Sequence, residues 1–301
     1  MRALRIGTRR SALARAQAET VRAALDAEQV DAIIVPLSTA GDEGEAPEGP
    51  AGAKGLWTGA IAQALREGEI DLAVHSAKDL PSEDDEGLTI GAVPERADPR
   101  DVLVVREDRE WLRPGIRVGT SSLRRRAQVL AAQPEAVVLP LRGNVDTRLR
   151  KVGDGEVDAA ILAAAGLERL GIASSHATPL GVDVMLPAPG QGALAVQCRA
   201  EARDLIAVLE LLDHRASRIS FETERALVRS LGGDCALPLG ALAVARGDTI
   251  RLAARVCSPD GDEVLDAAAQ AADPARAVRM VVRQLRDAGA DDVLERARSA
   301  T

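Results

Sequence analysis

The sequence predicts an α/β protein that ends in a smaller α+β domain. Over the first two-thirds of the chain, short apolar runs alternate with amphipathic helical patterns. This alternation is typical of domains built on largely parallel sheets. From about Asp213 the order changes to a helix, a pair of strands and a final helix. A chain of 301 residues is long enough for two or three such domains.

The first expected element is a strand at 4–7, and Ser11 can cap a following helix that runs to about Ala27. Further strands are expected at 33–37, 70–75, 102–105, 116–118, 137–141 and 159–162. Helices are expected at 56–67, 122–132, 145–152 and 163–170. The C-terminal domain should contain helix 217–230, strands 250–257 and 263–268 joined by a turn at 258–261, and helix 274–288. No internal repeat is visible in the sequence.

Three segments lack these patterns. Residues 95–100 are polar and contain Pro, and residues 186–192 are rich in Pro and Gly, so each is a candidate crossing between two domains. Two crossings between the same domains would make a hinge beside a cleft. Residues 41–55, rich in Gly, Glu, Pro and Ala, are expected to form a mobile loop. The stretch Ala53-Lys54-Gly55 lacks the complete Walker pattern, which excludes a P-loop.

Composition excludes several classes of function. A net charge of −8 argues against a dedicated nucleic-acid-binding protein. No apolar run approaches the roughly 18 to 20 residues that span a bilayer, and the N-terminal residues lack the apolar core of a signal peptide. We therefore expect a cytoplasmic protein. Three cysteines are too few for a disulfide framework, and no Cys or His pair has zinc-ligand spacing, so no metal is expected.

The turn after the predicted strand at 116–118 combines helix-capping hydroxyls with arginines. Thr120 and Ser121 precede the helix, and Arg124 and Arg125 lie in its first turn. Cations are unfavourable at a helix N-terminus, so this pattern is reasonable if an external anion binds there. The alternative is a solvated basic helix face.

A second turn repeats the combination. Arg142 precedes the capping Asn144, and Arg148 follows one helical turn later. The alternative is a surface pair between Asp146 and Arg150 without function. The two turns together could hold a ligand with several carboxylates through bidentate contacts. Arg9 and Ser11, at the first strand-to-helix turn, could face them across the cleft.

Two further segments carry reactive side chains. Lys78 and Asp79 follow the strand that ends near His75, where a carboxylate could act as an acid, a base or a stabiliser of a cation. The alternatives are a structural Lys–Asp ion pair and a hydrogen-bonded core histidine.

Cys235 lies in a Gly-rich loop and could be a nucleophile or an attachment site. The alternative is an inert small apolar residue, which is the interpretation for Cys198 and Cys257.

Taken together, these segments resemble the porphobilinogen deaminase family. The matching stretches keep their order and spacing over essentially the whole chain. They are Arg5–Ser11, Gly52–Leu56, Val74–Pro81, Val118–Arg125, Leu141–Leu149, Asp158–Leu162, Gly166-Leu167, Pro189–Ala193 and the loop around Cys235. One motif would be weak evidence, but this many in register are specific.

The resemblance implies two lobes like those of a type II periplasmic binding protein, joined by a hinge, and a small C-terminal α+β domain. Domain 1 is then expected at 1–95 and 187–211, an arginine-rich domain 2 at 99–186 and domain 3 at 214–301. The resemblance also implies a monomer.

The family joins four porphobilinogen molecules head to tail, with loss of ammonia, on a covalently bound dipyrromethane, and releases hydroxymethylbilane by hydrolysis. The resemblance implies one dipyrromethane per chain, attached to Cys235 through a thioether, with porphobilinogen and the growing polypyrrole as ligands. Asp79 matches the principal catalytic residue, which would stabilise a developing cation. The residues expected to hold the cofactor are Lys78, Asp79, Thr120, Ser121, Arg124, Arg125, Arg142 and Asn144. Those expected to bind substrate are Arg9, Ser11, Arg142, Arg148 and Arg169. Lys54 and Trp57 are expected at a lid, and Gln191 at the hinge.

The chain departs from the family pattern at a few positions. Trp57 stands where Phe is common, and Ala40 where Arg or Ser is often found. Asp234 precedes Cys235 where Gly is usual, and a neighbouring carboxylate should disfavour the thiolate.

Other functions remain in competition at this point. A two-lobed binding protein for a small polyanion would fit the fold and the arginines, but it has no use for Cys235 or Asp79. A nucleic-acid-binding protein using the patch at 117–150 is disfavoured by the acidic net charge and the scarcity of aromatic residues. A paralogue that has lost its activity would have little reason to retain these polar residues.

Overall fold

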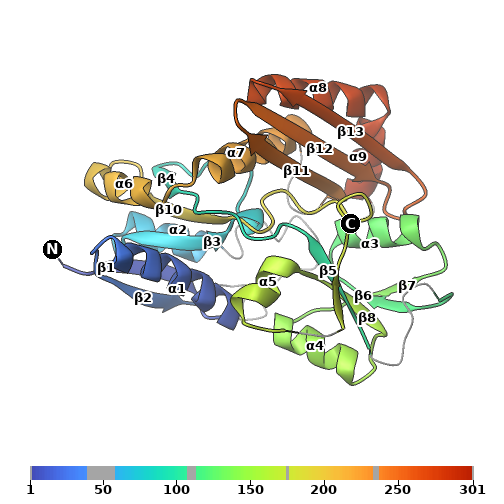
Figure 1. Cartoon of the computed structure of the whole chain (residues 1–301), viewed down its shortest axis with the longest axis horizontal. Coiled ribbons are helices and arrows are strands. Elements are labelled where there is room, and N and C mark those ends of the chain that lie inside the picture. The colour runs from blue at the N-terminus through green and yellow to red at the C-terminus, as the bar shows by residue number, and fades with distance from the viewer. Residues whose placement is uncertain (1, 39–57, 107–112, 174–175, 233–236, 300–301) are drawn as a thin grey trace. The chain divides into compact units, whose positions relative to one another are not determined.

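The computed structural model describes residues 2–38, 58–106, 113–173, 176–232 and 237–299. The chain divides into two compact units, and their helices and strands are labelled in Figure 1. Unit 1 comprises Met1–Ala97 and Ala193–Glu222, and unit 2 comprises Asp98–Gly192 and Thr223–Thr301. The chain therefore enters unit 2 at Asp98 and leaves it after Gly192, next to the two predicted crossings.

The described strands of unit 1 form one sheet in the order β2-β1-β3-β10-β4. Their bounds are β1 Leu4–Arg9, β2 Ala32–Leu37, β3 Leu72–Ser76, β4 Leu88–Ala92 and β10 Leu194–Arg199. The helices are α1 Ala12–Ala27, α2 Gly59–Arg66 and α6 Arg203–Leu209, with short 3-10 turns at η2 Ala77–Asp79 and η3 Glu210–Leu212. Helices α1 and α6 pack on the face of the sheet that carries Ile6, Val74 and Val196. Helix α2 packs on the opposite face, so both faces are buried.

The described strands of one sheet of unit 2 have the order β7-β6-β8-β5-β9. Their bounds are β5 Asp101–Val105, β6 Arg117–Gly119, β7 Val137–Leu139, β8 Ala159–Ala163 and β9 Ala177–Pro179. The helices are α3 Leu123–Ala132, α4 Val145–Gly153 and α5 Ala164–Arg169. Val129 of α3 packs on one face with Val118 and Ile161, and α4 and α5 pack on the other with Val102 and Leu162.

The two sheets share one topology. In each, the described strands make two parallel and two antiparallel pairings. One strand makes both antiparallel pairings, so the other four run in the same direction, as the prediction of largely parallel sheets required. The antiparallel partner in each sheet, β10 or β5, is the strand that follows a crossing between the units. This repeated arrangement agrees with the two-lobed fold that the resemblance implied.

An ion-paired aspartate also occurs at the same place in both sheets. Asp71, just before β3, accepts from the backbone N–H of Arg5 at 2.9 Å and from its guanidinium. Asp158, just before β8, accepts from the backbone N–H of Arg117 at 3.0 Å and from its guanidinium. The two sheets thus repeat a strand order and one Asp–Arg contact. They do not repeat an extended run of sequence, which explains why no internal repeat is visible in the sequence.

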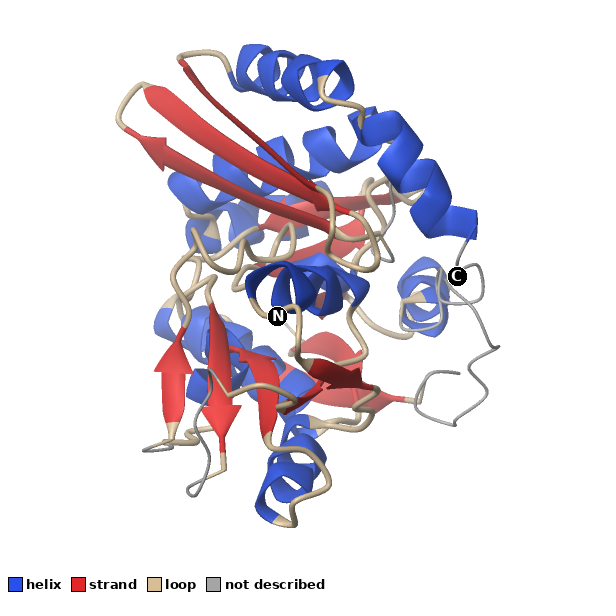
Figure 2. Ribbon diagram, turned by 90° about the vertical axis from the view of Figure 1, so that its right-hand side faces the viewer, coloured by secondary structure: helices blue, strands red, loops and turns tan. Residues whose placement is uncertain are grey.

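The small C-terminal α+β domain contains an antiparallel sheet of β11 Leu239–Arg246, β12 Thr249–Cys257 and β13 Val264–Ala271. Figure 2 shows these strands as three long arrows side by side. The helices are α7 Arg215–Ser230, α8 Pro274–Asp287 and α9 Ala290–Ser299. Within unit 2, a Cβ on Gly261 would lie 2.6 Å from the carbonyl oxygen of Ala127 in α3. A glycine is therefore required where this sheet meets α3.

Most expected elements lie within a few residues of their predicted positions, but several were missed. The missed elements are β4, β9, β10, β11, α6 and α9. Among the residues described, no helix combines the length and apolar character needed to cross a bilayer.

Candidate active site

In unit 1, several polar residues line one small cavity of about 50 Å³ at the ends of β1 and β3. Arg9 ends β1, and Ser11 caps α1, since its Oγ accepts from the N–H of Ala14 at 3.2 Å. Asp79 lies in η2, directly after β3, and is exposed to solvent, whereas Lys78 is half-buried. Arg9, Ser11 and Asp79 therefore share one cavity.

Gln17 is a member of this site that the sequence analysis missed. It is buried on α1, lines the cavity, and donates from Nε2 to Ser76 Oγ at 2.7 Å. Ser76 is the residue before η2, so this bond anchors the start of the turn that carries Asp79. A glutamine on the buried face of α1, between Ala14 and Val21, is a pattern that could have revealed it.

His75 also lines the cavity and is buried. Burial lowers the pKa of its imidazole from 6.5 to about 4, although Gln197 and Asp85 oppose this shift. The ring is therefore neutral near pH 7, and it can serve as a hydrogen-bonding group but not as a cation.

The free energy of unfolding should depend on pH because the pKa of His75 is lower in the folded protein than in the unfolded chain. The unfolded chain binds a proton near pH 6.5 and the folded protein only near pH 4, so the unfolded state holds more protons between these values. The free energy of unfolding should therefore fall as the pH is lowered through this window, by up to about 3 kcal/mol. Urea denaturation of wild type and His75→Gln at pH 7 and pH 5 checks this. The loss of unfolding free energy between pH 7 and pH 5 should be smaller in His75→Gln than in wild type, and it should persist in His176→Gln, whose histidine is exposed. An equal loss in all three proteins would rule out His75 as its source.

In unit 2, hydroxyl groups order the turn between β6 and α3. Ser122 caps α3, with its Oγ accepting from the N–H of Arg125 at 3.4 Å. Thr120 is buried and accepts from the N–H of Ser122 at 3.1 Å. Ser121 accepts from the N–H of Leu141 at 3.1 Å, which ties this turn to the loop before α4.

Arg124 and Arg125 turn inward from α3. Their exposed fractions are 4% and 5%, and each forms an ion pair of 2.7 Å with Asp101, which is 0% exposed. The sequence predicted an external anion at these arginines, with a solvated basic helix face as the alternative. The structure instead buries both side chains against an internal anion, Asp101. A lone Asp at the edge of an apolar run was the feature that could have indicated it.

The loop before α4 adds further cations. Arg142 and Asn144 are exposed, and Asn144 occupies the N-cap position of α4 without a capping hydrogen bond from its side chain. Arg148 is half-buried and donates from Nε to the carbonyl oxygen of Gly143 at 2.8 Å. Burial and then the charge of Arg125 lower the pKa of Arg148. Arg169 of α5 is half-buried and donates to the carbonyl oxygen of Gly192 at 2.7 Å.

These arginines fit a ligand with several carboxylates. Asp101 supplies one negative charge to the two guanidiniums of Arg124 and Arg125, and Arg148 adds a third cation nearby. In addition, Nε of Arg124 is buried without a hydrogen-bond partner among the described residues. A buried donor and an excess of positive charge both favour a bound anion. No group of three or more His, Cys, Asp or Glu that could hold a metal is found in the described ranges.

Several expected residues lie outside the described ranges. These are Lys54, Trp57, Asp234 and Cys235. Gln191 is described and buried, and its Nε2 donates to Asp101 at 2.9 Å and to the carbonyl oxygen of Pro99 at 2.8 Å.

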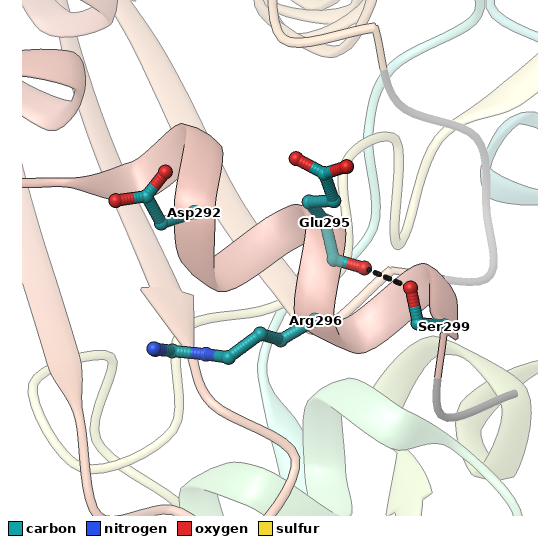
Figure 3. Close-up of a pocket in the computed structure, with 4 residues that line it drawn as sticks. All are labelled: Asp292, Glu295, Arg296 and Ser299. Atoms are coloured by element: carbon teal, nitrogen blue, oxygen red, sulfur yellow. Dashed lines mark hydrogen bonds between the residues drawn. The ribbon is translucent and has the colours of Figure 1, made fainter.

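A shallow groove on α9 has no comparable arrangement (Figure 3). It is lined by Asp292, Glu295, Arg296 and Ser299. Ser299 donates to the carbonyl oxygen of Glu295 at 3.1 Å, and Arg296 forms an ion pair with Glu263. These contacts are typical of a solvated helix surface, so the groove does not compete with the sites above.

Comparisons with known proteins identify relatives of this chain. The family model described as porphobilinogen deaminase, dipyromethane cofactor binding domain, matches residues 4–207, and the model of the porphobilinogen deaminase C-terminal domain matches residues 219–286. The chain is 42% identical to a porphobilinogen deaminase of Brevibacillus brevis over 296 residues, covering 96% of each protein. It is 46% identical to one of Chromobacterium violaceum over 292 residues, covering 95% of this chain and 94% of the relative. The periplasmic VFT2 domain of Bordetella pertussis BvgS is a distant structural match, with a TM-score of 0.42 and 15% identity over 76% of this chain and 92% of that domain. That score is too low to support an argument.

Proposed function

Because this chain belongs to the porphobilinogen deaminase family, we propose that the residues described above carry out the family's reaction. The enzyme is a transferase that condenses four porphobilinogen molecules on a dipyrromethane cofactor and releases hydroxymethylbilane. The observation that carries the assignment of residues is the exposed carboxylate of Asp79 in one cavity with Arg9 and Ser11.

Asp79 is proposed as the catalytic residue. Its solvent-facing carboxylate can accept hydrogen bonds from pyrrole N–H groups, stabilise the cation that forms as ammonia leaves, and assist proton transfer. Arg9 and Ser11 bind carboxylates of the substrate beside it. The bond between Gln17 and Ser76 supports this arrangement, because it holds the turn in which Asp79 lies.

The cofactor is proposed to be attached to Cys235 through a thioether, and it supplies the pyrrole carbon to which each new unit is joined. Each added porphobilinogen brings two more carboxylates, so the chain needs several cations to bind them. The residues proposed to hold the cofactor are Lys78, Asp79, Thr120, Ser121, Arg124, Arg125, Arg142 and Asn144. Those proposed for substrate and the growing chain are Arg9, Ser11, Arg142, Arg148 and Arg169.

Lys54 and Trp57 are proposed for a lid and Gln191 for the hinge. The domain boundaries 1–95 with 187–211, 99–186 and 214–301 remain our proposal, as do a monomeric state, a cytoplasmic location and the absence of a nucleic-acid partner.

The direct test is to incubate the purified protein with porphobilinogen and measure ammonia and hydroxymethylbilane. Release of four ammonia molecules per hydroxymethylbilane supports the proposal. Tight binding of porphobilinogen without either product would favour a non-catalytic binding protein instead.

Replacing Arg148 with Leu should weaken binding of the carboxylated substrate. Hydrogen bonds to charged groups contribute about 1.5–3 kcal/mol, so we expect KM for porphobilinogen to rise about 10–100-fold. Arg150→Leu is a matched control, because Arg150 is an exposed arginine of the same helix. Steady-state kinetics should separate the two variants; equal KM values would exclude a binding role for Arg148.

A further inference from the structure

The segments at which the chain first enters unit 2 and then leaves it meet at one carboxylate. We call residues 98–101 the entry segment and residues 186–192 the exit segment. Asp101, at the end of the entry segment, accepts from Arg125 Nη2 at 2.7 Å and Nε at 3.1 Å, and from Arg124 Nη1 at 2.7 Å. It also accepts from Gln191 Nε2 of the exit segment at 2.9 Å. One buried side chain therefore joins both segments to the first turn of α3.

The exit segment is bound to α3 at a second point. The carbonyl oxygen of Leu186 accepts from Arg124 Nη1 at 2.8 Å and from Gln128 Nε2 at 3.0 Å. The N–H of Leu186 donates to Gln128 Oε1 at 2.7 Å. Gln191 bridges the two segments directly, since its Nε2 also donates to the carbonyl oxygen of Pro99. The exit segment is thus a bonded part of unit 2 rather than a loose linker.

The charges in this cluster do not balance. Asp101 carries one negative charge, and Arg124 and Arg125 carry two positive charges, all with little or no access to solvent. Burial alone would raise the pKa of the Asp101 carboxyl, but Arg125 and Arg124 hold that pKa well below its ordinary value. The carboxylate therefore stays ionised, and a second anion is needed to neutralise the cluster.

Arg125 and Arg124 differ in how much of their bonding capacity is already used. Arg125 donates from Nε and Nη2 to Asp101 and from Nη1 to the carbonyl oxygen of Ile161 at 2.9 Å. Arg124 uses Nη1 for both Asp101 and Leu186, and its buried Nε has no partner among the described residues. An anion that binds this Nε of Arg124 therefore contacts the same guanidinium whose Nη1 holds Asp101 and the exit segment.

We propose that Asp101 is a positioning residue, which couples occupancy of the arginine site at α3 to the conformation of the entry and exit segments. This inference rests on the proposed function, because the anion is a carboxylate of the pyrrole chain. When a ligand carboxylate draws on Arg124, the bonds from Arg124 to Asp101 and to Leu186 weaken together. Gln191 transmits the change, since it bonds to Asp101 and to Pro99 at once.

The test compares Asp101→Asn with Asp158→Asn in the cofactor-loaded enzyme. Asp158 is a matched control: it is 1% exposed, lies in the same unit, and pairs with Arg113 at 2.7 Å and Arg117 at 2.9 Å, neither of which belongs to the entry or the exit segment. Both variants should lower the Tm. Porphobilinogen is the probe, and the readouts are KM, kcat and hydrogen–deuterium exchange of peptides covering 98–106 and 186–193.

In wild type and Asp158→Asn, porphobilinogen should change exchange in both peptides, and KM should agree within about twofold. In Asp101→Asn, KM should rise about tenfold with a smaller change in kcat, and the two peptides should no longer respond together. If Asp101→Asn differs from Asp158→Asn in neither KM nor exchange, Asp101 is a structural ion-pair partner only.

A second variant keeps the test decisive if Asp101→Asn does not fold. Gln191→Met removes the bonds to Asp101 and Pro99 but leaves the ion pairs of α3. The response of the exit segment to porphobilinogen should then be smaller than in wild type, because, of the bonds described, only that from Arg124 to Leu186 still couples that segment to the arginine. A response equal to that of wild type would overturn the proposal. Failure of wild type to make hydroxymethylbilane would instead reject the proposed function itself, so the two failures are distinguishable.

Discussion

Replacing Asp79 with Asn should lower turnover by about 10²–10⁴-fold while leaving the fold and the bound cofactor intact. Asn has nearly the same shape but cannot balance a developing positive charge or take up a proton. Because Asp79 is exposed and lies at the surface of its cavity, the substitution should cost little stability. The measurements are kcat by product formation, cofactor content by intact mass, and Tm.

Asp26→Asn is the control for this experiment, because Asp26 is an exposed carboxylate of α1 in the same unit. It makes the same change in net charge away from the cavity, and its kcat should stay within about twofold of wild type. Wild-type turnover in Asp79→Asn would remove Asp79 from the catalytic role. A loss of cofactor along with turnover would show a role in assembly instead.

Replacing Cys235 with Ser should abolish cofactor attachment. The intact mass of the wild-type protein should exceed that of the polypeptide by two porphobilinogen units less two ammonias, and this excess should be absent from Cys235→Ser. A hydroxyl is a far weaker nucleophile than a thiolate at neutral pH, so no slow attachment should replace it. If the purified wild-type protein lacks the excess, incubation with porphobilinogen should produce it.

The other cysteines provide the controls. Cys198 in β10 and Cys257 in β12 are buried, and burial raises the pKa of each thiol to about 11. Both are therefore unreactive at pH 7, and Cys198→Ala and Cys257→Ala should keep the mass excess. A wild-type mass that stays unmodified after incubation with porphobilinogen would contradict the deaminase assignment.

The local elements of the fold could be predicted from sequence, but the pairing of strands could not. The helix that Ser11 caps was expected to end near Ala27, and α1 does so, because capping and periodicity are local properties. The position of β10 between β3 and β4 depends on residues more than a hundred positions away in the chain. The short strands β4 and β9 were missed because each reads as a loop until its partner strand is known.

In the candidate site, too, local features could be predicted from the sequence and contacts between distant residues could not. The segments that carry Asp79, Ser121 and Arg148 could be found from turns and charges, since each follows a predicted strand. The partners that fix these segments could not be found in this way. Asp101 begins a buried strand next to a polar crossing, and its role emerges only when α3 brings Arg124 and Arg125 to it.

The interleaving of the two sheets also determines when each can form during translation. The five-stranded sheet of unit 2, from β5 to β9, uses strands from one continuous stretch between Asp101 and Pro179. The sheet of unit 1 lacks its strand between β3 and β4 until Leu194–Arg199 has left the ribosome. The second lobe of the nascent chain can therefore close its sheet before the first, the reverse of the usual N-terminal-first order. Until then the edges of β3 and β4 stay open to pairing with other chains.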